Sequence, residues 1–292
     1  MFILLLVVLI VVDIPRIIKL HFLSTESFLN LDLQYVQKER VHLIDRTVIS
    51  MTTIPERINN LKVALSSLLN NTQRVDEIII NIPYLTRKGK EYNIPLWLSS
   101  CKSIKIIRCD YDYGSSTKLL PTLQRENPNT NIIVVDDDIL YGVKTIQLLA
   151  ETFMKRNCKE VVTTVSIWEE NNKLMHFFNF ILWEGPCKKV FGYMGYILKP
   201  SMISDRVFDY SKAPKEAVLV DDDWITGWIL YKKTPIYTVG LKFGNAPYFT
   251  LNNLDTPMLK FNNSDGLNAK IVQNFFKNNV LQEKEKEKLK EK

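Results

Sequence analysis

Short runs of β-branched residues alternate with longer segments at helical spacing from about residue 42 onward. This alternation is typical of βαβ units and predicts an α/β fold, with a mainly parallel sheet flanked by helices in a single domain. The runs rich in Ile and Val, each bounded by polar residues, predict five strands: Thr47–Thr53, Glu77–Ile82, Ile104–Arg108, Asn131–Val135 and Glu160–Ile167.

Apolar residues that recur every three or four positions predict helices between these strands. Ile58, Leu61, Leu65 and Leu68 would form one face of an amphipathic helix. Further helices are predicted over about Lys144–Asn157 and from about Asp222 to Tyr231.

The first residues form a separate hydrophobic segment, 1–23. Phe2–Val12 is an uninterrupted apolar run that stops at Asp13. A helix needs about 20 apolar residues to cross a bilayer, so the run alone would suit a signal sequence, an interfacial segment or buried structure. Extended to Leu23 it could form an uncleaved single-pass anchor, with Arg16 and Lys19 on the cytoplasmic side. We therefore expect the protein to be membrane-associated.

The rest of the chain divides into a main domain, 42–280, and a tail, 281–292. The tail alternates Lys and Glu with almost no apolar side chains, which is typical of a solvated helix or a disordered end. The whole chain is 46% hydrophobic and 24% charged, the composition of a globular protein. Its net charge of +6 is spread rather than clustered, so nucleic-acid binding is not indicated. The four cysteines lack zinc-type spacing, and whether any of them form a disulfide stays open.

An acidic triplet follows one predicted strand directly. The apolar strand at Asn131–Val135 ends in Asp136, Asp137 and Asp138. In open α/β sheets ligands bind beyond the carboxyl ends of the strands, and three adjacent carboxylates repel one another unless a cation lies between them. A divalent ion with oxygen ligands, Mg²⁺ or Mn²⁺, would relieve the repulsion and could also hold a diphosphate. The alternative is an acidic turn that faces water.

Two loops carry candidate groups for a nucleotide. Thr53 and Arg57 follow the first strand, where hydroxyls and a guanidinium could contact a nucleotide. The alternative is a plain helix cap by Thr52 or Thr53, with Arg57 solvated. Lys118 follows a Gly turn after the third strand and could neutralise phosphate, although the loop lacks the ending of a P-loop. There the alternative is a capped helix start with an exposed lysine.

A second acidic triplet, Asp221–Asp223, opens a predicted helix. The helix dipole stabilises acids in this position, but three in a row exceed what capping requires. One of them could act as a general base toward an acceptor hydroxyl. In addition, Tyr193 and Gly195 lie in an aromatic and glycine-rich stretch that could contact a sugar or acceptor, or could simply pack a loop.

The two acidic triplets and the Thr52–Arg57 segment, taken in this order, resemble the GT-A class of nucleotide-sugar glycosyltransferases. The resemblance is nearest to the glycosyltransferase-2-like and exostosin-like branches and spans roughly residues 45–270. It implies a Rossmann-like GT-A fold and a DxD motif. In that motif Asp138 would be the main metal ligand, with Asp136 as a further ligand or reaching the ribose or donor sugar, and Asp137 assisting.

The same resemblance implies the remaining roles. Asp222 matches the acid of the family's Glu-Asp pair, with Asp221 in place of the usual Glu, so both are candidate catalytic residues. The positions of Thr53, Arg57 and Lys118 in their loops, argued above, make them candidate donor-binding residues. No downstream histidine offers a further metal ligand, and because the class contains inverting and retaining enzymes, the role of Asp222 as base is not fixed.

The sequence therefore predicts a glycosyltransferase dependent on Mn²⁺ or Mg²⁺. It would move a sugar from a UDP- or GDP-sugar to a hydroxyl of a glycan, protein or lipid acceptor. One alternative is a metal-dependent phosphotransferase or phosphatase, but Asp138 is followed by Ile139 and Leu140 rather than by the loop of such enzymes. The other alternative is a non-catalytic carbohydrate-binding protein with a degenerate site.

Overall fold

The computed structural model describes residues 14–164, 184–240, 248–249 and 266–280. The apolar run Phe2–Val12, the charged tail 281–292 and the end of the predicted strand Glu160–Ile167 lie outside these residues.

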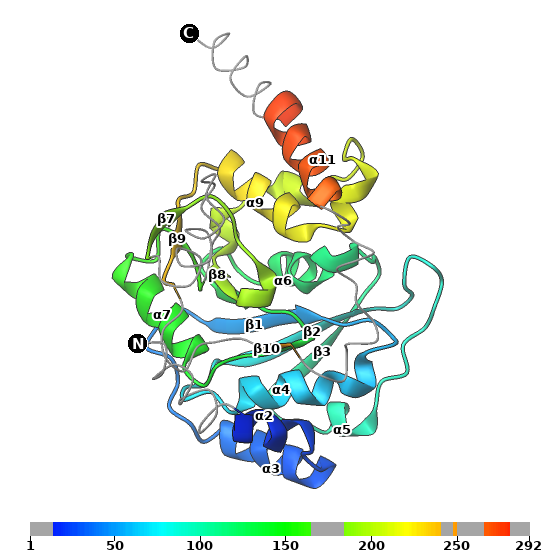
Figure 1. Cartoon of the computed structure of the whole chain (residues 1–292), viewed down its shortest axis with the longest axis vertical. Helices are drawn as coiled ribbons and strands as arrows, with labels where there is room; N and C mark the ends of the chain where they lie inside the picture. The colour runs from blue at the N-terminus through cyan, green and yellow to red at the C-terminus, as the bar shows by residue number, and fades with distance from the viewer. Residues whose placement is uncertain (1–13, 165–183, 241–247, 250–265, 281–292) are drawn as a thin grey trace.

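One eight-stranded mixed sheet forms the centre of the described part of the chain (Figure 1). Its strands lie in the order β3 (Ile104–Cys109), β2 (Glu77–Pro83), β1 (Thr47–Thr52), β4 (Asn131–Val134), β8 (Tyr196–Leu198), β6 (Val161–Thr163), β9 (Ile236–Thr238) and β7 (Gly185–Cys187). A separate pair is formed by β5 (Ile139–Leu140) and β10 (Tyr248–Phe249).

Most strands of the sheet point the same way. β3, β2, β1 and β4 pair in parallel, and β6 runs with them because β8 pairs antiparallel with both β4 and β6. β9 is parallel to β6, so only β8 and β7 run in the opposite direction among the described strands. The predicted α/β fold with a mainly parallel sheet is confirmed.

Helices cover both sides of the sheet. Figure 1 shows α4 on one side of β1–β3, together with α2, α3 and α5, whereas α6, α9 and α11 lie on the other side. The described helices are α2 (Ile14–His21), α3 (Thr25–Tyr35), α4 (Leu61–Leu69), α5 (Leu96–Ser99), α6 (Leu120–Arg125), α7 (Thr145–Lys155), α9 (Asp221–Tyr231) and α11 (Leu267–Phe275). The short helical turns are η2 (Ile58–Asn60), η3 (Gly114–Lys118), η4 (Gly192–Met194), η5 (Pro200–Met202), η6 (Asp205–Phe208), η7 (Lys215–Val218) and η10 (Phe276–Val280).

Each of the three predicted helices is present with slightly shifted ends. The first begins as η2 and continues as α4, the second is α7, and the third is α9, which already includes Asp221. Propensity and periodicity place elements well, whereas their ends depend on capping and packing.

The N-terminal helices α2 and α3 pack against this body. Phe28 and Tyr35 of α3 are fully buried in the main core, and the Tyr35 hydroxyl accepts a hydrogen bond from the backbone N–H of Val75 at 2.9 Å. Residues before 42 thus contribute to the core. Within the described residues no helix has the length and apolar character needed to cross a bilayer.

Candidate functional site

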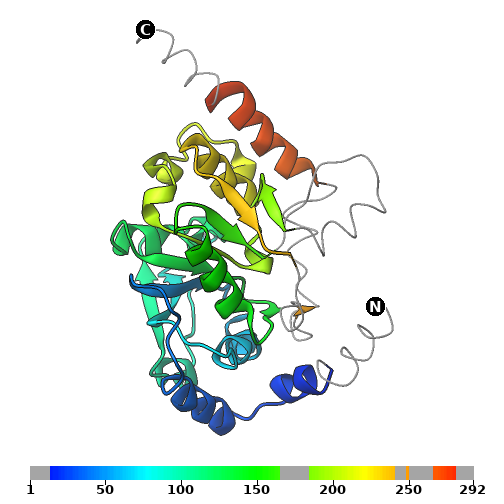
Figure 2. The ribbon, with the colours of Figure 1, turned by 90° about the vertical axis from the view of Figure 1, so that its left-hand side faces the viewer.

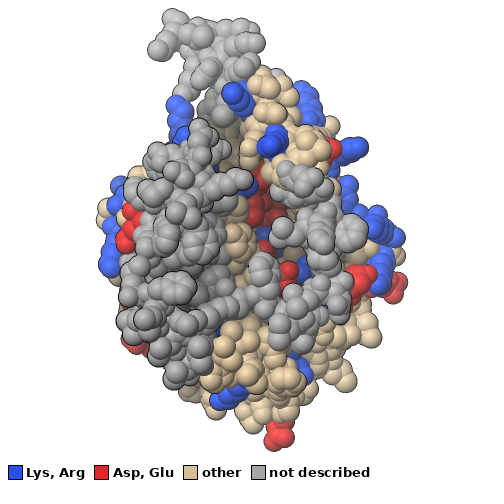
Figure 3. Space-filling view, in the orientation of Figure 1, with Lys and Arg blue, Asp and Glu red and all other residues tan. Residues whose placement is uncertain are grey.

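The candidate site lies at the carboxyl ends of β1 and β4. These strands are parallel neighbours, with Ser50 of β1 in register with Val134 of β4, so the residues that follow them emerge at one edge of the sheet. The register brings the Thr53–Arg57 loop beside the acidic triplet Asp136–Asp138. Figure 3 shows acidic side chains with basic ones beside them near the centre of the face that is turned to the viewer.

The loop after β1 binds the last two aspartates of the triplet, Asp137 and Asp138. The Thr53 hydroxyl donates to Asp137 Oδ2 at 2.6 Å. Arg57 Nη1 donates to Asp138 Oδ2 at 2.7 Å and lies 3.1 Å from Asp137 Oδ1. The helical turn begins only at Ile58, and neither it nor α4 has a side-chain cap, so the alternative of a helix cap by Thr52 or Thr53 is wrong.

Lys118 joins the two acidic triplets. Its ammonium lies 2.5 Å from Asp136 Oδ1 and 2.8 Å from Asp221 Oδ2. Only 4% of Lys118 is exposed, so the alternative of an exposed lysine is wrong. Burial alone would lower the pKa of Lys118, but the facing carboxylates of Asp136 and Asp221 outweigh it and raise the pKa well above the usual value. Lys118 is therefore a charged group held inside the protein.

A small polar network fixes the backbone of Lys118. The Ser50 hydroxyl donates to the Lys118 carbonyl at 2.5 Å and lies 2.6 Å from the Thr122 hydroxyl. The Asn81 amide donates to Thr122 Oγ1 at 2.9 Å. All three polar side chains are fully buried and come from β1, β2 and α6, so the strands themselves place the lysine.

Gly192 and Tyr141 complete the site, and we did not predict either from the sequence. A Cβ on Gly192 would lie 2.2 Å from Lys118 Nζ and 2.8 Å from Asp136 Oδ1, so only glycine leaves room for this ion pair. The Gly192 N–H donates to Asp222 Oδ1 at 2.9 Å, and its carbonyl accepts from the Tyr141 hydroxyl at 3.1 Å. The same hydroxyl accepts from the backbone N–H of Asp136 at 2.8 Å.

The three acids that open α9 have different surroundings. Asp221 faces Lys118, and Asp222 accepts from Gly192. Asp223 is held by Lys189 at 2.7 and 2.8 Å and by Gln273 of α11 at 2.7 Å. Asp223 therefore fastens α11 to α9, whereas Asp221 and Asp222 point toward the first triplet.

Burial raises the pKa of three carboxyl groups of the site, those of Asp136, Asp137 and Asp222. Burial, reinforced by the charge of Asp138, raises the pKa of Asp137 to about 6, although Arg57 and Thr53 oppose the shift. Burial and the neighbouring Asp221 raise the pKa of Asp222 to about 7. A group that titrates near neutral pH is suited to proton transfer.

Tyr193 and Gly195, the two candidates from the aromatic stretch, lie in different surroundings. Tyr193 is half-buried, and burial with Asp222 and Asp136 nearby raises its pKa to about 12, so its hydroxyl stays protonated beside the acids. Gly195 has φ +80° and is buried, and its carbonyl accepts from the Thr164 N–H at 3.2 Å. The structure thus places Tyr193 in the site and makes Gly195 a turn at the start of β8.

The residues fit a divalent ion whose remaining coordination positions would be filled by a bound ligand. Arg57 pairs with Asp137 and Asp138, and Lys118 pairs with Asp136 and Asp221 while also feeling the charge of Asp222. Asp136 uses Oδ1 toward Lys118 and Asp138 uses Oδ2 toward Arg57, and both side chains remain about a quarter exposed, at 26% and 27%. Within the described ranges no group of three or more His, Cys, Asp or Glu side chains is arranged so that it could hold a metal ion by itself. Mg²⁺ typically takes one or two carboxylates together with substrate phosphates, which matches this arrangement.

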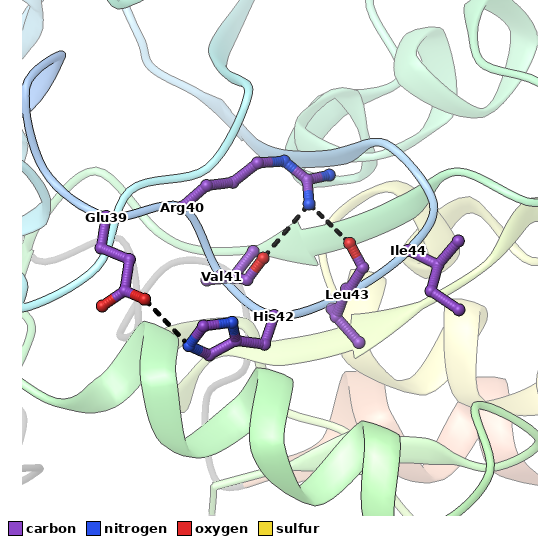
Figure 4. A pocket seen from close by; sticks show the side chains of 6 residues that line it. All are labelled: Glu39, Arg40, Val41, His42, Leu43 and Ile44. Carbon is purple, nitrogen blue, oxygen red and sulfur yellow. Dashed lines mark hydrogen bonds and ion pairs between the residues drawn. The ribbon is translucent and has the colours of Figure 1, made fainter.

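A shallow depression elsewhere offers no comparable chemistry. It has a volume of about 440 Å³ and is lined by Glu39–Ile44, just before β1, at the amino end of the sheet. Figure 4 shows Arg40 turned back onto the carbonyls of Val41 and Leu43, while His42 pairs with Glu39 at 3.2 Å. The polar groups there are bound to each other rather than directed at a ligand.

Comparison with known proteins finds similar solved structures but no family model and no curated relative. TarS from S. aureus, residues 1–349, is 12% identical, with 80% of this chain and 71% of that chain covered and a TM-score of 0.47. The mannosyltransferase PcManGT from Pyrobaculum calidifontis, solved with GDP-Man and Mn²⁺, is 12% identical, with 77% and 65% covered and a TM-score of 0.44. The chain spans less than two thirds of the mannosyltransferase. Both scores are below 0.5, so the roles of the site residues rest on the contacts within this chain.

Proposed function

We propose that this chain is a glycosyltransferase that moves a sugar from a nucleoside diphosphate sugar to an acceptor hydroxyl. The observation that carries the proposal is the convergence of both acidic triplets on Lys118, at the carboxyl edge of a mainly parallel sheet. Ligands of open α/β sheets bind at this edge. The order of the motifs, which resembles that of GT-A enzymes, supports the same function.

The charge balance of the site explains how a diphosphate would bind. The carboxylates outnumber the cations, so a diphosphate could not approach without a further positive charge. Asp138 and Asp136 would hold Mn²⁺ or Mg²⁺, and such an ion, when bound, offsets the charge of the leaving diphosphate.

The remaining residues would position the donor and acceptor. Thr53 and Arg57 hold Asp137 and Asp138 in place, and Arg57 lies where it could also attract a phosphate oxygen. Asp222 is the candidate base for the acceptor hydroxyl, since the Gly192 N–H orients it and its pKa of about 7 allows it to take a proton near neutral pH. Lys118 differs from the expected phosphate ligand, because its ammonium is already shared by Asp136 and Asp221. We propose instead that it keeps the two motifs together.

The test is release of nucleoside diphosphate from a panel of UDP- and GDP-sugars by the purified full-length chain. We expect release from one or a few donors with Mn²⁺ or Mg²⁺, faster with the correct acceptor and abolished by EDTA. Release of inorganic phosphate from simple phosphate esters, without turnover of any nucleotide sugar, would instead support the phosphatase alternative.

The same purified protein can be used to distinguish a glycosyltransferase from a protein that only binds carbohydrate. A non-catalytic sugar-binding protein would show no nucleotide turnover, and its melting temperature would be unaffected by UDP or GDP with Mn²⁺. A glycosyltransferase should be stabilised by its nucleotide, since a ligand that binds only the folded state raises the melting temperature.

A further inference from the structure

The helix α2 presents an apolar stripe to solvent. Ile14, Ile18 and Phe22 recur every four residues, so they lie on one side of the helix and its C-terminal end. Their exposed fractions are 41%, 53% and 85%. A soluble surface rarely presents an aligned series of large apolar side chains without a partner for it.

The opposite side of α2 is attached to the protein body. Leu20 is buried in a small cluster with Val63 of α4 and Leu140 of β5. Arg16 Nη1 donates to the carbonyl of Tyr141 at 3.0 Å. The side of α2 that faces the core is therefore already packed, and the exposed stripe is a separate surface. Figure 2 shows α2 at the periphery of the molecule, at the end nearest the N-terminus.

The sequence before α2 favours a lipid surface as the partner. Phe2–Val12 is wholly apolar and leads directly to the stripe, so apolar residues dominate the N-terminal 22 positions. The charged residues within α2 are the cations Arg16 and Lys19, and Lys19 is exposed. An apolar face next to basic side chains is the pattern of a helix that lies in a membrane interface and favours anionic lipid.

We propose that the outward face of α2, formed by Ile14, Ile18 and Phe22, binds a lipid bilayer surface. The attached side of α2 is linked to the acidic site by hydrogen bonds. Arg16 holds the carbonyl of Tyr141, and the hydroxyl of Tyr141 contacts both Asp136 and Gly192. The inference stands apart from the proposed enzymatic function, since it rests on a surface outside the acidic site.

The test is co-sedimentation of the full-length chain with vesicles of phosphatidylcholine alone and with added phosphatidylglycerol. We expect binding to both, tighter with the anionic lipid. The double variant Ile18→Glu/Phe22→Glu should bind at least about tenfold more weakly, because each apolar side chain moved out of water contributes a factor of about ten. Leu267→Glu is the matched control, since Leu267 is 60% exposed on α11, and it should bind like the parent.

Three results would overturn the proposal. Vesicle binding unchanged by the double variant would assign any membrane attachment to other residues. Absence of binding by the parent chain would exclude a lipid surface as the partner. Loss of a dimer in the double variant, seen by analytical ultracentrifugation without lipid, would make the stripe an interface between two copies. Equal melting temperatures of the parent and both variants would show that the substitutions do not destabilise the fold.

Discussion

Lys118 and Asp221 form a buried ion pair at 2.8 Å between η3 and α9, segments that are far apart in the sequence. The carboxylate oxygen faces the ammonium without the alignment of a hydrogen bond, so charge attraction holds the pair. Lys118 reaches Asp136 at the same time. One side chain thus determines the distance between the acids that follow β4 and the acids that open α9.

Lys118→Met should destabilise the protein. The change removes the cation and leaves the buried Asp221 and the largely buried Asp136 without their partner, a loss that typically costs about 3–5 kcal/mol. Urea unfolding measures the difference. Adding Asp221→Asn to this variant should recover part of the lost stability, because one of the uncompensated charges is then gone. Equal unfolding free energies for parent and Lys118→Met would show that the ion pair is not formed in solution.

Gly192→Ala should reduce both activity and stability, because it disturbs the buried ion pairs of Lys118. The added Cβ would collide with the end of the Lys118 side chain, which can move, but its movement breaks the alignment of Asp136 and Asp221. Misplacement of a catalytic group by about 1 Å can cost about 100-fold in rate, and we expect a fall in kcat/KM of that order.

Gly89→Ala is the control for Gly192→Ala. Gly89 lies in an exposed turn with φ +75° and has no atom within 4 Å of an added Cβ. Its substitution should therefore cost stability through backbone strain and leave kcat/KM unchanged. If Gly192→Ala keeps full activity, the close approach to Lys118 is not needed for function.

Asp222→Asn should make the protein more stable at alkaline pH while abolishing transfer. Burial and Asp221 raise the pKa of Asp222 from 3.8 to about 7, so the folded state binds this proton more tightly than the unfolded state. The stability that this proton provides is complete below about pH 4 and is lost as the pH rises through 7. At pH 8 the variant, which has no carboxylate to ionise, should be more stable by on the order of 1–2 kcal/mol, allowing for solvent at this half-buried side chain.

The measurement is the unfolding free energy of parent and Asp222→Asn at pH 5 and pH 8. Asp137 also titrates near pH 6, but it does so in both proteins, so their difference isolates Asp222. Parallel pH profiles for the two proteins would show that Asp222 has an ordinary pKa, and its role as the base would then need another explanation.

The fold could be predicted from the sequence because the buried parallel strands are continuous apolar runs. Ile78–Ile80 of β2 and Ile132–Val134 of β4 are fully buried on both faces, and such runs leave little choice of structure. The acidic triplets and Arg57 could also be found, since charged residues directly after a buried strand or at a helix start are conspicuous.

The side chains that pair with these charges could not be predicted from the sequence in the same way. Lys118 looked like a phosphate ligand because its loop has a Gly turn and hydroxyls, but its neighbours Asp136 and Asp221 come from distant segments that only the sheet order brings together. Gly192 and Tyr141 matter through close packing and backbone hydrogen bonds, and neither has a distinctive local pattern. The sequence offers one signal, for Gly192 alone, which lies in the same aromatic and glycine-rich stretch as Tyr193 and Gly195.

The most direct test of the central claim is calorimetric titration of UDP and GDP into the parent chain and Asp138→Asn, each with Mn²⁺ and with EDTA. Asp138 is bound through one oxygen by Arg57, so the isosteric change should leave the fold intact while removing a charged ligand of the ion. We predict that one nucleotide binds the parent only when Mn²⁺ is present, and that Asp138→Asn binds it at least about 100-fold more weakly, as expected for a lost metal ligand. Equal binding in EDTA, or equal binding by the variant, would contradict a metal-held diphosphate at this site.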